Sequence, residues 1–301
     1  MNNLLLCIIT KNYIFKHILR PIGPLLWKNA QFLHGLCNIC GNVTVFFFND
    51  DYRESLVCNR CFTTSRYRSI ARGILLAIKE IKGIEAESIK DLVKSYSNLS
   101  DSTRFKIYDT QVPFYGLYRA YPVPDMLSKC KWIDVQTSIY RPQQKWGVKL
   151  GPNTTNQNLE QLTFSDNSFD IVITSDVMEH VRLDDRAHQE VCRVLKPGGV
   201  YLFTVPHFRD KSEPLIRVAV TDPDDPSKDQ FLMEKEYHGD VNFTDKALSY
   251  RSYGTNLDNY LRRLGFTVEY SKEDFVETAI INTELFFCHL SKLNFFQKGW
   301  T

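Results

Sequence analysis

Four cysteines near the beginning of the sequence are spaced as metal ligands. The segments CNIC and CNRC place Cys37, Cys40, Cys58 and Cys61 in two Cys-x-x-Cys pairs, and Gly41 follows the first pair. Each pair can turn two thiolates toward one point, and two such turns supply the four sulfur ligands that structural Zn²⁺ favours. We therefore predict a closed zinc site in a small ribbon-like module, with a redox pair or four free thiols as the alternative.

A second reactive group follows the apolar run at residues 169–174 (FDIVIT). Its members are Ser175, Asp176, Glu179 and His180. Reactions that remove a proton from a hydroxyl use a positioned base, and His180 suits this task because the ordinary histidine pKa of ~6.5 lets the ring accept a proton near neutrality. His207 and His238 are rival bases, and Asp176 is expected to contact a cofactor or an acceptor.

The spacing Asp176-x-x-Glu179-His180 also allows a second metal site. If a helix begins near Asp176, residues three and four apart share one face, so the three side chains can converge on one ion. His238 of the segment EYHGD would complete the ligand shell. The alternative is structural, with Glu179 facing solvent and the His180 ring N–H bonded to a carbonyl.

The elements that position these residues alternate along the chain. We expect strands at residues 43–48, 104–109, 131–137, 169–174, 200–205, 266–270 and 285–290, and helices at residues 185–195 and 257–264. Apolar strands that alternate with amphipathic helices predict an α/β fold, with a parallel sheet covered on both faces. Ligands of such sheets bind beyond the carboxyl ends of the strands, where Asp109, Ser138, Ser175, Asp176 and His207 are expected.

Two longer segments resemble a known family. The segments LTFSDNSFDIVITSDVMEHV and EVCRVLKPGGVYLFTVP, followed by EYHGD and RRLGFTVEY, resemble class I S-adenosylmethionine-dependent methyltransferases of the type 11 subgroup over most of residues 104–272. The resemblance implies a doubly wound, mostly parallel, seven-stranded Rossmann-like sheet that binds S-adenosylmethionine. A zinc-ribbon-like segment before such a domain is similar to an arrangement found among bacterial methyltransferases.

The resemblance also implies the positions that contact the cofactor. They are Asp109, Thr110, Asp134, Ser138, Asn158, Leu159, Ser175 and Asp176. The chain departs from the family pattern at three of the expected positions. The segment YDTQVPFYG lacks the usual glycines except for Gly116, the acid after the second strand is either Asp134 inside the strand or replaced by Ile139, and Asn158 stands where an acid is common.

The acid-x-x-Glu-His pattern has its own resemblance. It is similar to a motif in small-RNA 3′-terminal 2′-O-methyltransferases and in ubiquinone-pathway catechol O-methyltransferases, which bind a divalent metal. That resemblance implies Mg²⁺ or Mn²⁺ at Asp176, Glu179, His180 and His238, acting as a Lewis acid on the attacked hydroxyl.

Length and charge set the wider frame. The 301 residues are 43% hydrophobic and carry a net charge of +2, so no strong field favours nucleic acid. We divide the chain into a helical segment (1–34), the zinc-ribbon module (35–72), a helical linker (73–103) and a methyltransferase domain (104–295). The apolar run at residues 4–9 is too short to span a bilayer, and peripheral membrane contact of the first segment is an open alternative.

These observations predict a cytoplasmic S-adenosylmethionine-dependent methyltransferase that methylates an oxygen of a small molecule or a glycan precursor. Acceptor choice is assigned to the polar insertion at residues 221–230. One alternative is an RNA methyltransferase that docks through the ribbon and through Arg66, Arg68 and Arg72 of the segment RYRSIAR. The other is a degenerate, non-catalytic binding module.

Overall fold

The computed structural model describes residues 31–48, 52–99, 104–116, 119–208, 210–239, 246–271 and 274–292. The helix and the membrane contact predicted for the first 30 residues lie outside this range. Residues 31–34, which were assigned to the same helix, form part of a strand. Among the described residues, we find no helix with the length and apolar character needed to cross a membrane.

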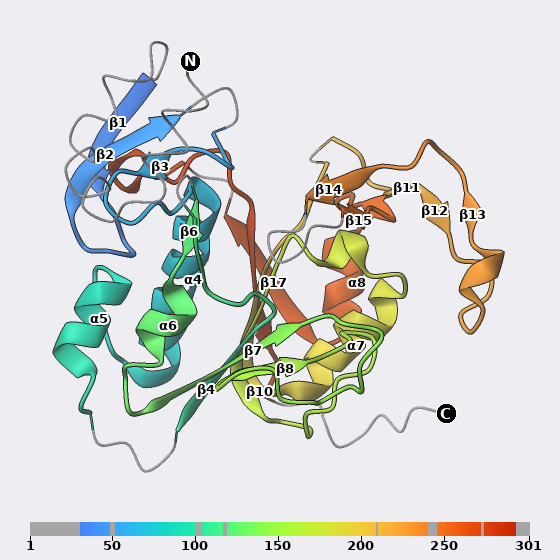
Figure 1. Ribbon diagram of the computed structural model, residues 1–301, viewed down its shortest axis with the longest axis horizontal. Helices are drawn as coiled ribbons and strands as arrows, with labels where there is room; N and C mark the ends of the chain where they lie inside the picture. Colours follow the sequence, from blue (N-terminus) through green and yellow to red (C-terminus); the bar gives the residue numbers. More distant parts are fainter. Residues whose placement is uncertain are drawn as a thin grey trace.

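A mostly parallel sheet of seven strands forms the centre of the protein (Figure 1). In spatial order its strands are β17 (Phe266–Ser271), β18 (Leu285–Leu290), β10 (Leu195–Thr204), β9 (Phe169–Ser175), β4 (Phe105–Asp109), β7 (Ile133–Ile139) and β8 (Thr154–Asn156). Only β18 runs antiparallel to its neighbours, β10 and β17. The predicted fold class is therefore confirmed, and each strand expected in the sheet is present.

Alternating side chains of the sheet enter two separate hydrophobic cores. Ile171, Ile173 and Leu202 pack on one face, whereas Val172 and Tyr201 pack on the other. This follows from the two-residue repeat of a strand, which sends successive side chains to opposite faces. A sheet apolar on both faces must be covered on both faces, as the near-continuous apolar runs predicted.

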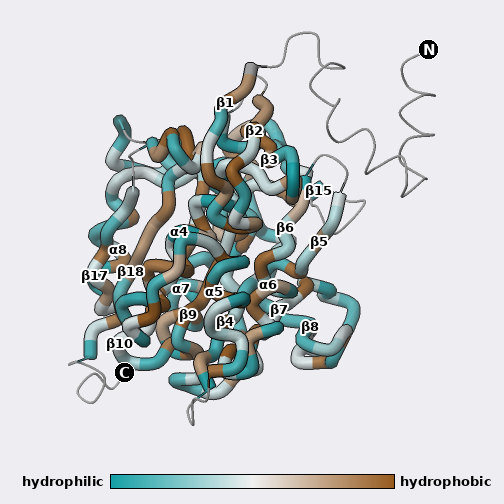
Figure 2. Tube along the Cα trace, turned by 90° about the vertical axis from the view of Figure 1, so that its left-hand side faces the viewer, coloured by the Kyte–Doolittle hydropathy of each residue, from teal (hydrophilic) through white to brown (hydrophobic). Residues whose placement is uncertain are grey.

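Helices cover the two faces of the sheet. On one side lie α4 (Ser65–Lys82), α5 (Ile89–Tyr96) and α6 (Val123–Leu127), which stand in front of the sheet in Figure 2. On the other side lie α7 (Asp184–Val194) and α8 (Leu257–Arg263) (Figure 1). The helices predicted at residues 185–195 and 257–264 are confirmed within one residue at each end.

The cysteine-bearing segment forms an antiparallel sheet of β1 (Gln31–Leu36), β2 (Val43–Phe48) and β3 (Val57–Cys58). Its buried residues Phe46 and Leu56 belong to the same hydrophobic core as α4 and one face of the large sheet. The module is therefore built onto the large sheet. The segment at residues 73–103, which we predicted as a linker, supplies helices that cover that sheet.

Short helices and short strands lie at the carboxyl edge of the sheet. The 3₁₀ helices are η1 (Met178–His180), η2 (Pro226–Lys228) and η3 (Val276–Thr278), and the short strands are β5 (Phe114–Tyr115), β6 (Ala120–Tyr121), β11 (Leu215–Ile216), β12 (Val218–Ala219), β13 (Gln230–Phe231), β14 (Tyr237–Gly239), β15 (Lys246–Leu248) and β16 (Arg251–Ser252). The polar insertion contains η2. Arg182 holds it by two bonds to the Asp229 carboxylate, both 2.8 Å long.

Replacing Gly73 of α4 tests how closely this helix packs on the sheet. A Cβ atom at Gly73 would lie 2.8 Å from Leu285 Cδ2 and 3.1 Å from Leu202 Cδ2. We expect Gly73→Val to lower the free energy of unfolding by ~1–3 kcal/mol, the usual effect of overpacking a core. Denaturant unfolding measures this, with Gly239→Val as the control because its Cβ would meet nothing within 4 Å. Equal stability of the two variants would contradict the close packing.

Candidate functional site

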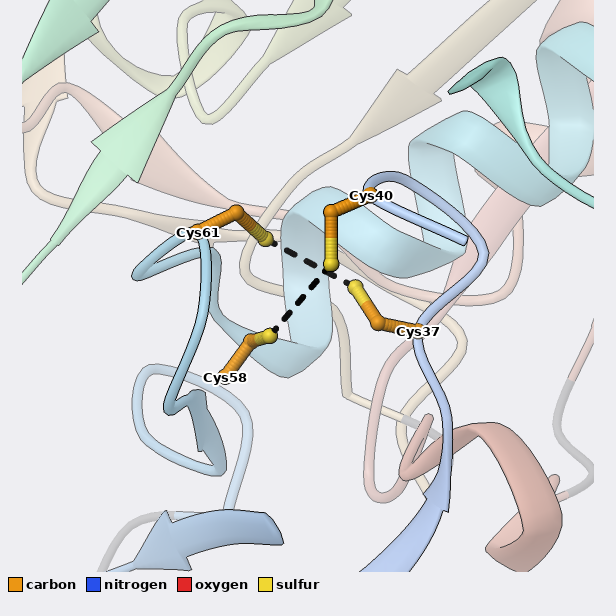
Figure 3. A group of neighbouring side chains, drawn as sticks. All are labelled: Cys37, Cys40, Cys58 and Cys61. Atoms are coloured by element: carbon orange, nitrogen blue, oxygen red, sulfur yellow. Dashed lines mark hydrogen bonds between the residues drawn. The ribbon is translucent and has the colours of Figure 1, made fainter. Parts of the chain in front are cut away.

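The four predicted cysteine ligands converge on one point (Figure 3). The sulfur atoms lie within 4.8 Å of one another, with Cys37 and Cys61 at 3.6 Å and Cys40 and Cys58 at 3.9 Å. Four sulfurs at ~2.3 Å from a tetrahedral ion would be ~3.8 Å apart. All four are free thiols, so the donor set and its spacing fit Zn²⁺.

Each Cys-x-x-Cys turn ends on a residue with left-handed backbone. Gly41 follows the first turn with φ of 64°, and its N–H donates to Cys37 O at 2.8 Å. Phe62 occupies the equivalent place after the second turn with φ of 60°, and its N–H donates to Cys58 O at 2.9 Å. Glycine adopts this conformation readily, whereas phenylalanine is strained in it. Other interactions of the fold must offset that strain energy.

The same module reaches the end of β9 through two arginines. Arg53 donates to both carboxylate oxygens of Asp176, at 2.5 and 2.7 Å, and Arg66 Nε lies 3.3 Å from the same carboxylate. Arg66 also donates to the Ser175 hydroxyl. Two residues that we predicted to contact cofactor are therefore held by the cysteine module.

Opposite charges in this cluster fix the protonation of Asp176. Burial alone would raise the pKa of its carboxyl, but the charges of Arg66 and Arg53 outweigh burial and hold the pKa well below its usual range. Glu54 binds the same two arginines and also Arg119, whose Nη1 lies 2.9 Å away. The two arginines thus favour the ionised form of Asp176 and occupy its carboxylate oxygens, so a role as general base does not fit it.

The chain order of the strands reverses between β4 and β9. From β4 the chain adds β7 and β8 on one side, and then β9 and β10 on the other. Ligands of open α/β sheets bind in the crevice at such a reversal, beyond the carboxyl ends of the strands. Asp109 and Thr110 stand at the end of β4, and Ser175 and Asp176 stand at the end of β9.

Gln111 connects the two sides of this reversal, and no sequence motif pointed to it. Its Nε2 donates to Ser175 O at 3.2 Å, which orients the amide. Its Oε1 is buried and accepts no hydrogen bond among the described residues. An unpartnered buried acceptor costs ~1–3 kcal/mol, so this atom is suited to receive a donor from a ligand.

Asp109 is buried beside Gln111 and is 2% exposed. Its carboxylate accepts from the Gln111 N–H at 2.9 Å and from the Tyr121 hydroxyl at 2.7 Å. Burial raises the pKa of Asp109 to about 7, although both hydrogen bonds act to lower it. The hairpin of β5 and β6, which carries Tyr121, therefore closes over the acid that we expected to face cofactor.

The other predicted cofactor residues divide by position. Ser138 lies near the carboxyl end of β7, where its hydroxyl bonds that of Tyr108 at 2.8 Å. Asn158 and Leu159 lie just past β8, and Thr110 bonds Ile173 O at 3.2 Å. Asp134 is the second residue of β7, at the amino end of the strand, so the structure does not bring it to this edge.

The resemblance implies S-adenosylmethionine as cofactor, and the residues at and after the end of β4 suit one part of it. The loop after β4 has no glycine turn, and Gly116 instead serves the hairpin, because a Cβ there would lie 2.5 Å from Arg119 O. The free Gln111 acceptor beside the Asp109 carboxyl suits the ammonium group of an amino acid. The two acceptors therefore fit the ammonium group in the amino-acid part of S-adenosylmethionine.

Glu179, His180 and His238 form a second group, with one ligand atom from each within 4.8 Å of the others. Asp176 does not join them, because the predicted helix does not begin there. Asp176 has a left-handed backbone with φ of 50°, and the short helix η1 starts two residues later. The alternative of a solvent-facing Glu179 is also wrong, because the residue is fully buried.

Burial, followed by the nearby charge of Asp176, raises the pKa of Glu179 well above its usual range. His180 Nδ1 lies 2.8 Å from Leu248 O, which is the carbonyl contact of the structural alternative. That contact orients the ring without excluding a function for the other nitrogen.

His207 follows β10 and belongs to a different pair. Its Nδ1 lies 2.8 Å from a carboxylate oxygen of Glu284, the residue that precedes β18. Its Nε2 is buried and has no partner among the described residues. A carboxylate that holds one ring nitrogen leaves the other as a proton acceptor, the arrangement typical of a general base.

The prediction of an RNA-docking surface is wrong for two of its three arginines, because they are buried. Arg66 and Arg68 are 4% and 0% exposed. Arg68 donates to the carbonyls of Leu56, Thr63 and Ala279, each at 2.7 Å. These guanidinium groups hold the module together and are not offered to phosphate.

Part of the chain is similar to a known protein family. Residues 125–203 match a family model described as a methyltransferase domain. The matched segment runs from α6 into β10 and therefore includes β9 and its polar edge. The resemblance of the sequence motifs is confirmed over this segment.

Two curated methyltransferases are similar over short segments. The ubiquinone/menaquinone biosynthesis C-methyltransferase UbiE of Hydrogenovibrio crunogenus is 42% identical over 73 residues, which are 24% of this chain and 28% of that protein. The glycine/sarcosine/dimethylglycine N-methyltransferase of Actinopolyspora halophila is 41% identical over 59 residues, 20% of this chain and 10% of that protein. The chain thus spans less than a third of the length of either relative.

Among solved structures, an S-adenosylmethionine-dependent methyltransferase from Mesorhizobium loti is 16% identical, with a TM-score of 0.37 over 65% of this chain and 99% of that chain. The fold rests on the observed sheet order rather than on this likeness.

The raised pKa of Asp109 predicts how stability depends on pH. The folded state keeps a proton that the unfolded chain releases near pH 4, so stability falls as the pH rises from about 4 to about 7. A pKa of about 7 corresponds to a loss of ~4 kcal/mol over this window. Denaturant unfolding at pH 5 and pH 7.5 should show a little over half of this loss, ~2–3 kcal/mol, in the natural chain and a smaller one in Asp109→Asn. The same loss in both proteins would refute the assignment.

Proposed function

We propose that the protein is an S-adenosylmethionine-dependent methyltransferase whose cofactor lies at the carboxyl ends of β4 and β9. The observation that carries this proposal is the position of Gln111, Asp109 and Ser175 at the reversal of strand order. The match of residues 125–203 to a methyltransferase domain supports it, because the matched segment contains one side of this crevice.

The bound cofactor would supply a methyl group on a sulfonium centre. Gln111 Oε1 and the Asp109 carboxyl would receive its ammonium group, and Ser138, Asn158 and Leu159 would border its nucleoside part. Asp176 would act at a distance from the reaction, because its bonds to Arg53 fix the end of β9. The chain's own residues would thereby bind and orient the cofactor. An in-line methyl transfer depends mainly on such positioning of the reacting groups.

We propose an oxygen acceptor, in a small molecule or a glycan precursor. A hydroxyl must lose its proton during transfer, and the His207–Glu284 pair supplies a positioned base for that step. The two curated relatives are named for carbon and nitrogen acceptors, so the choice of oxygen rests on this pair and not on them. The insertion held by Arg182 is the proposed acceptor-binding loop.

Calorimetry with S-adenosylmethionine and S-adenosylhomocysteine tests the cofactor site. We expect saturable binding of both, and Gln111→Leu should weaken it about 10- to 100-fold, because a hydrogen bond to a charged group contributes ~1.5–3 kcal/mol. The control is Gln143→Leu, an exposed position in the loop after β7. Absence of binding heat at millimolar ligand would overturn the methyltransferase proposal. The alternative of a non-catalytic binding module would then remain.

We further propose that the cysteine cluster binds one structural Zn²⁺. Sulfur spacing supports this, and a four-thiolate site has no open position for substrate. Such an ion would hold the segment that carries Arg53 and Arg66 against β9. Free thiols of this kind persist in a reducing compartment, and we propose the cytoplasm.

A mercurial reagent that displaces zinc from thiolates tests this arrangement. We expect it to release about one zinc ion for each chain, since four thiolates form one closed site. Amide hydrogen exchange at residues 52–68 and 175–178 should then rise together, because the arginine contacts to Asp176 are lost. Amide hydrogen exchange in strand β4 is the internal control and should stay unchanged. No zinc in the released fraction, or unchanged exchange at residues 175–178, would contradict the proposal.

A further inference from the structure

Three side chains at the carboxyl edge of the sheet share a small volume apart from the cysteine cluster. Glu179 and His180 belong to η1, and His238 belongs to β14. One ligand atom from each lies within 4.8 Å of the other two, and the two imidazole rings are nearly perpendicular with centroids 4.9 Å apart. The backbone ties the two elements together, because His180 Nδ1 contacts Leu248 O in the strand that pairs with β14.

The carboxyl group of Glu179 has no partner that explains its burial. The residue is 0% exposed, and neither carboxylate oxygen accepts a hydrogen bond among the described residues. The nearest ring nitrogen in the cluster belongs to His180, with Nε2 at 3.8 Å from Oε1. Buried carboxylates are retained in proteins when a cation or a set of donors satisfies them.

Both histidines have an acceptor at one ring nitrogen. For His180 the acceptor is the Leu248 carbonyl, 2.8 Å from Nδ1. For His238 it is Glu236, with Oε1 2.8 Å from Nε2, and Arg217 holds the second oxygen of Glu236 at 2.7 Å. If these nitrogens carry the protons, as their acceptors require, the opposite nitrogen of each ring has a lone pair. Metal-binding histidines are oriented in this way.

We propose that Glu179, His180 and His238 bind one divalent transition-metal ion. Two ligands at 2.0–2.2 Å from a common ion are about 3.0–3.4 Å apart, so the 3.8 Å between His180 and Glu179 closes with a shift of less than ~1 Å. Two imidazoles and one carboxylate favour Zn²⁺, Fe²⁺, Co²⁺ or Mn²⁺ over Mg²⁺, which prefers oxygen ligands. Three protein ligands leave further coordination positions for water or for an oxygen of a bound molecule.

This site differs from the one that the sequence predicted. Asp176 is not a ligand, because Arg53 occupies both of its carboxylate oxygens. It is also distinct from the cysteine cluster in donor type, and it does not depend on the proposed methyltransferase activity. Calorimetry with S-adenosylmethionine therefore fails or succeeds independently of metal binding here.

Titration of the full-length, zinc-containing protein with Co²⁺ tests the proposal. We expect one Co²⁺ to bind for each chain, with visible absorption from nitrogen and oxygen ligands and without the intense near-ultraviolet band of cobalt thiolate. Glu179→Gln and His238→Gln should abolish this binding. Glu236→Gln should weaken it about 10- to 100-fold, the usual effect of removing an outer-shell partner.

His289→Gln is the matched control, because His289 lies on β18 beside Glu80 and outside the cluster. Thermal unfolding of each variant before Co²⁺ is added checks the fold, and His238→Gln decides the test if the buried Glu179→Gln does not fold. The proposal is overturned if Co²⁺ enters only with the cobalt thiolate band, if no Co²⁺ binds, or if a folded Glu179→Gln or His238→Gln variant binds it as the natural chain does.

Discussion

The ion pair between Arg53 and Asp176 connects the two parts of this protein. One partner lies in the loop between the cysteine pairs and the other at the end of a central strand, 123 residues later in the chain. Asp176 has left-handed backbone, a conformation that costs a non-glycine residue about 1 kcal/mol or more. Its two-pronged contact with the guanidinium offsets that cost and fixes the direction in which the chain leaves β9.

The features around the crevice follow from this constraint. Arginine holds Asp176, and the short helix that follows brings Glu179 and His180 close to His238. Ser175 is held by Arg66, so its carbonyl is available to orient Gln111. Residues 175–180 therefore contact arginines of the cysteine module through Ser175 and Asp176, and they meet His238 of β14 through Glu179 and His180.

Much of the fold could be predicted from sequence, because strand and helix periodicities are local. The runs at residues 169–174 and 285–290, and the amphipathic helix at residues 185–195, needed no distant information. The cysteine spacing was equally informative, since two Cys-x-x-Cys turns carry their own geometry. The elements missed were those whose form depends on distant packing, such as β1, the short hairpins and the role of α4 as a cover for the sheet.

The site was less predictable for the same reason. Helical spacing of Asp176 and Glu179 was a reasonable hypothesis, but an arginine 123 residues earlier in the chain decides the backbone there. Arg66 and Arg68 had the composition of an exposed basic face, and only the tertiary structure shows the carbonyls and carboxylates that bury them. Gln111 carried no signal, because a single amide gains meaning only from the unpartnered oxygen beside Asp109.

Arg68 has a consequence for the order of events in folding. Its guanidinium binds Leu56 and Thr63 in the cysteine module and Ala279, 211 residues away, while Ser65 bonds Ile281 across 216 residues. Closing such long loops is entropically slow, and during synthesis the later segment leaves the ribosome long after the module. Until the last strands are synthesised, Arg68 can bind Leu56 and Thr63 within the module but lacks the contact with Ala279. Nascent chains should be most vulnerable to proteolysis during that interval.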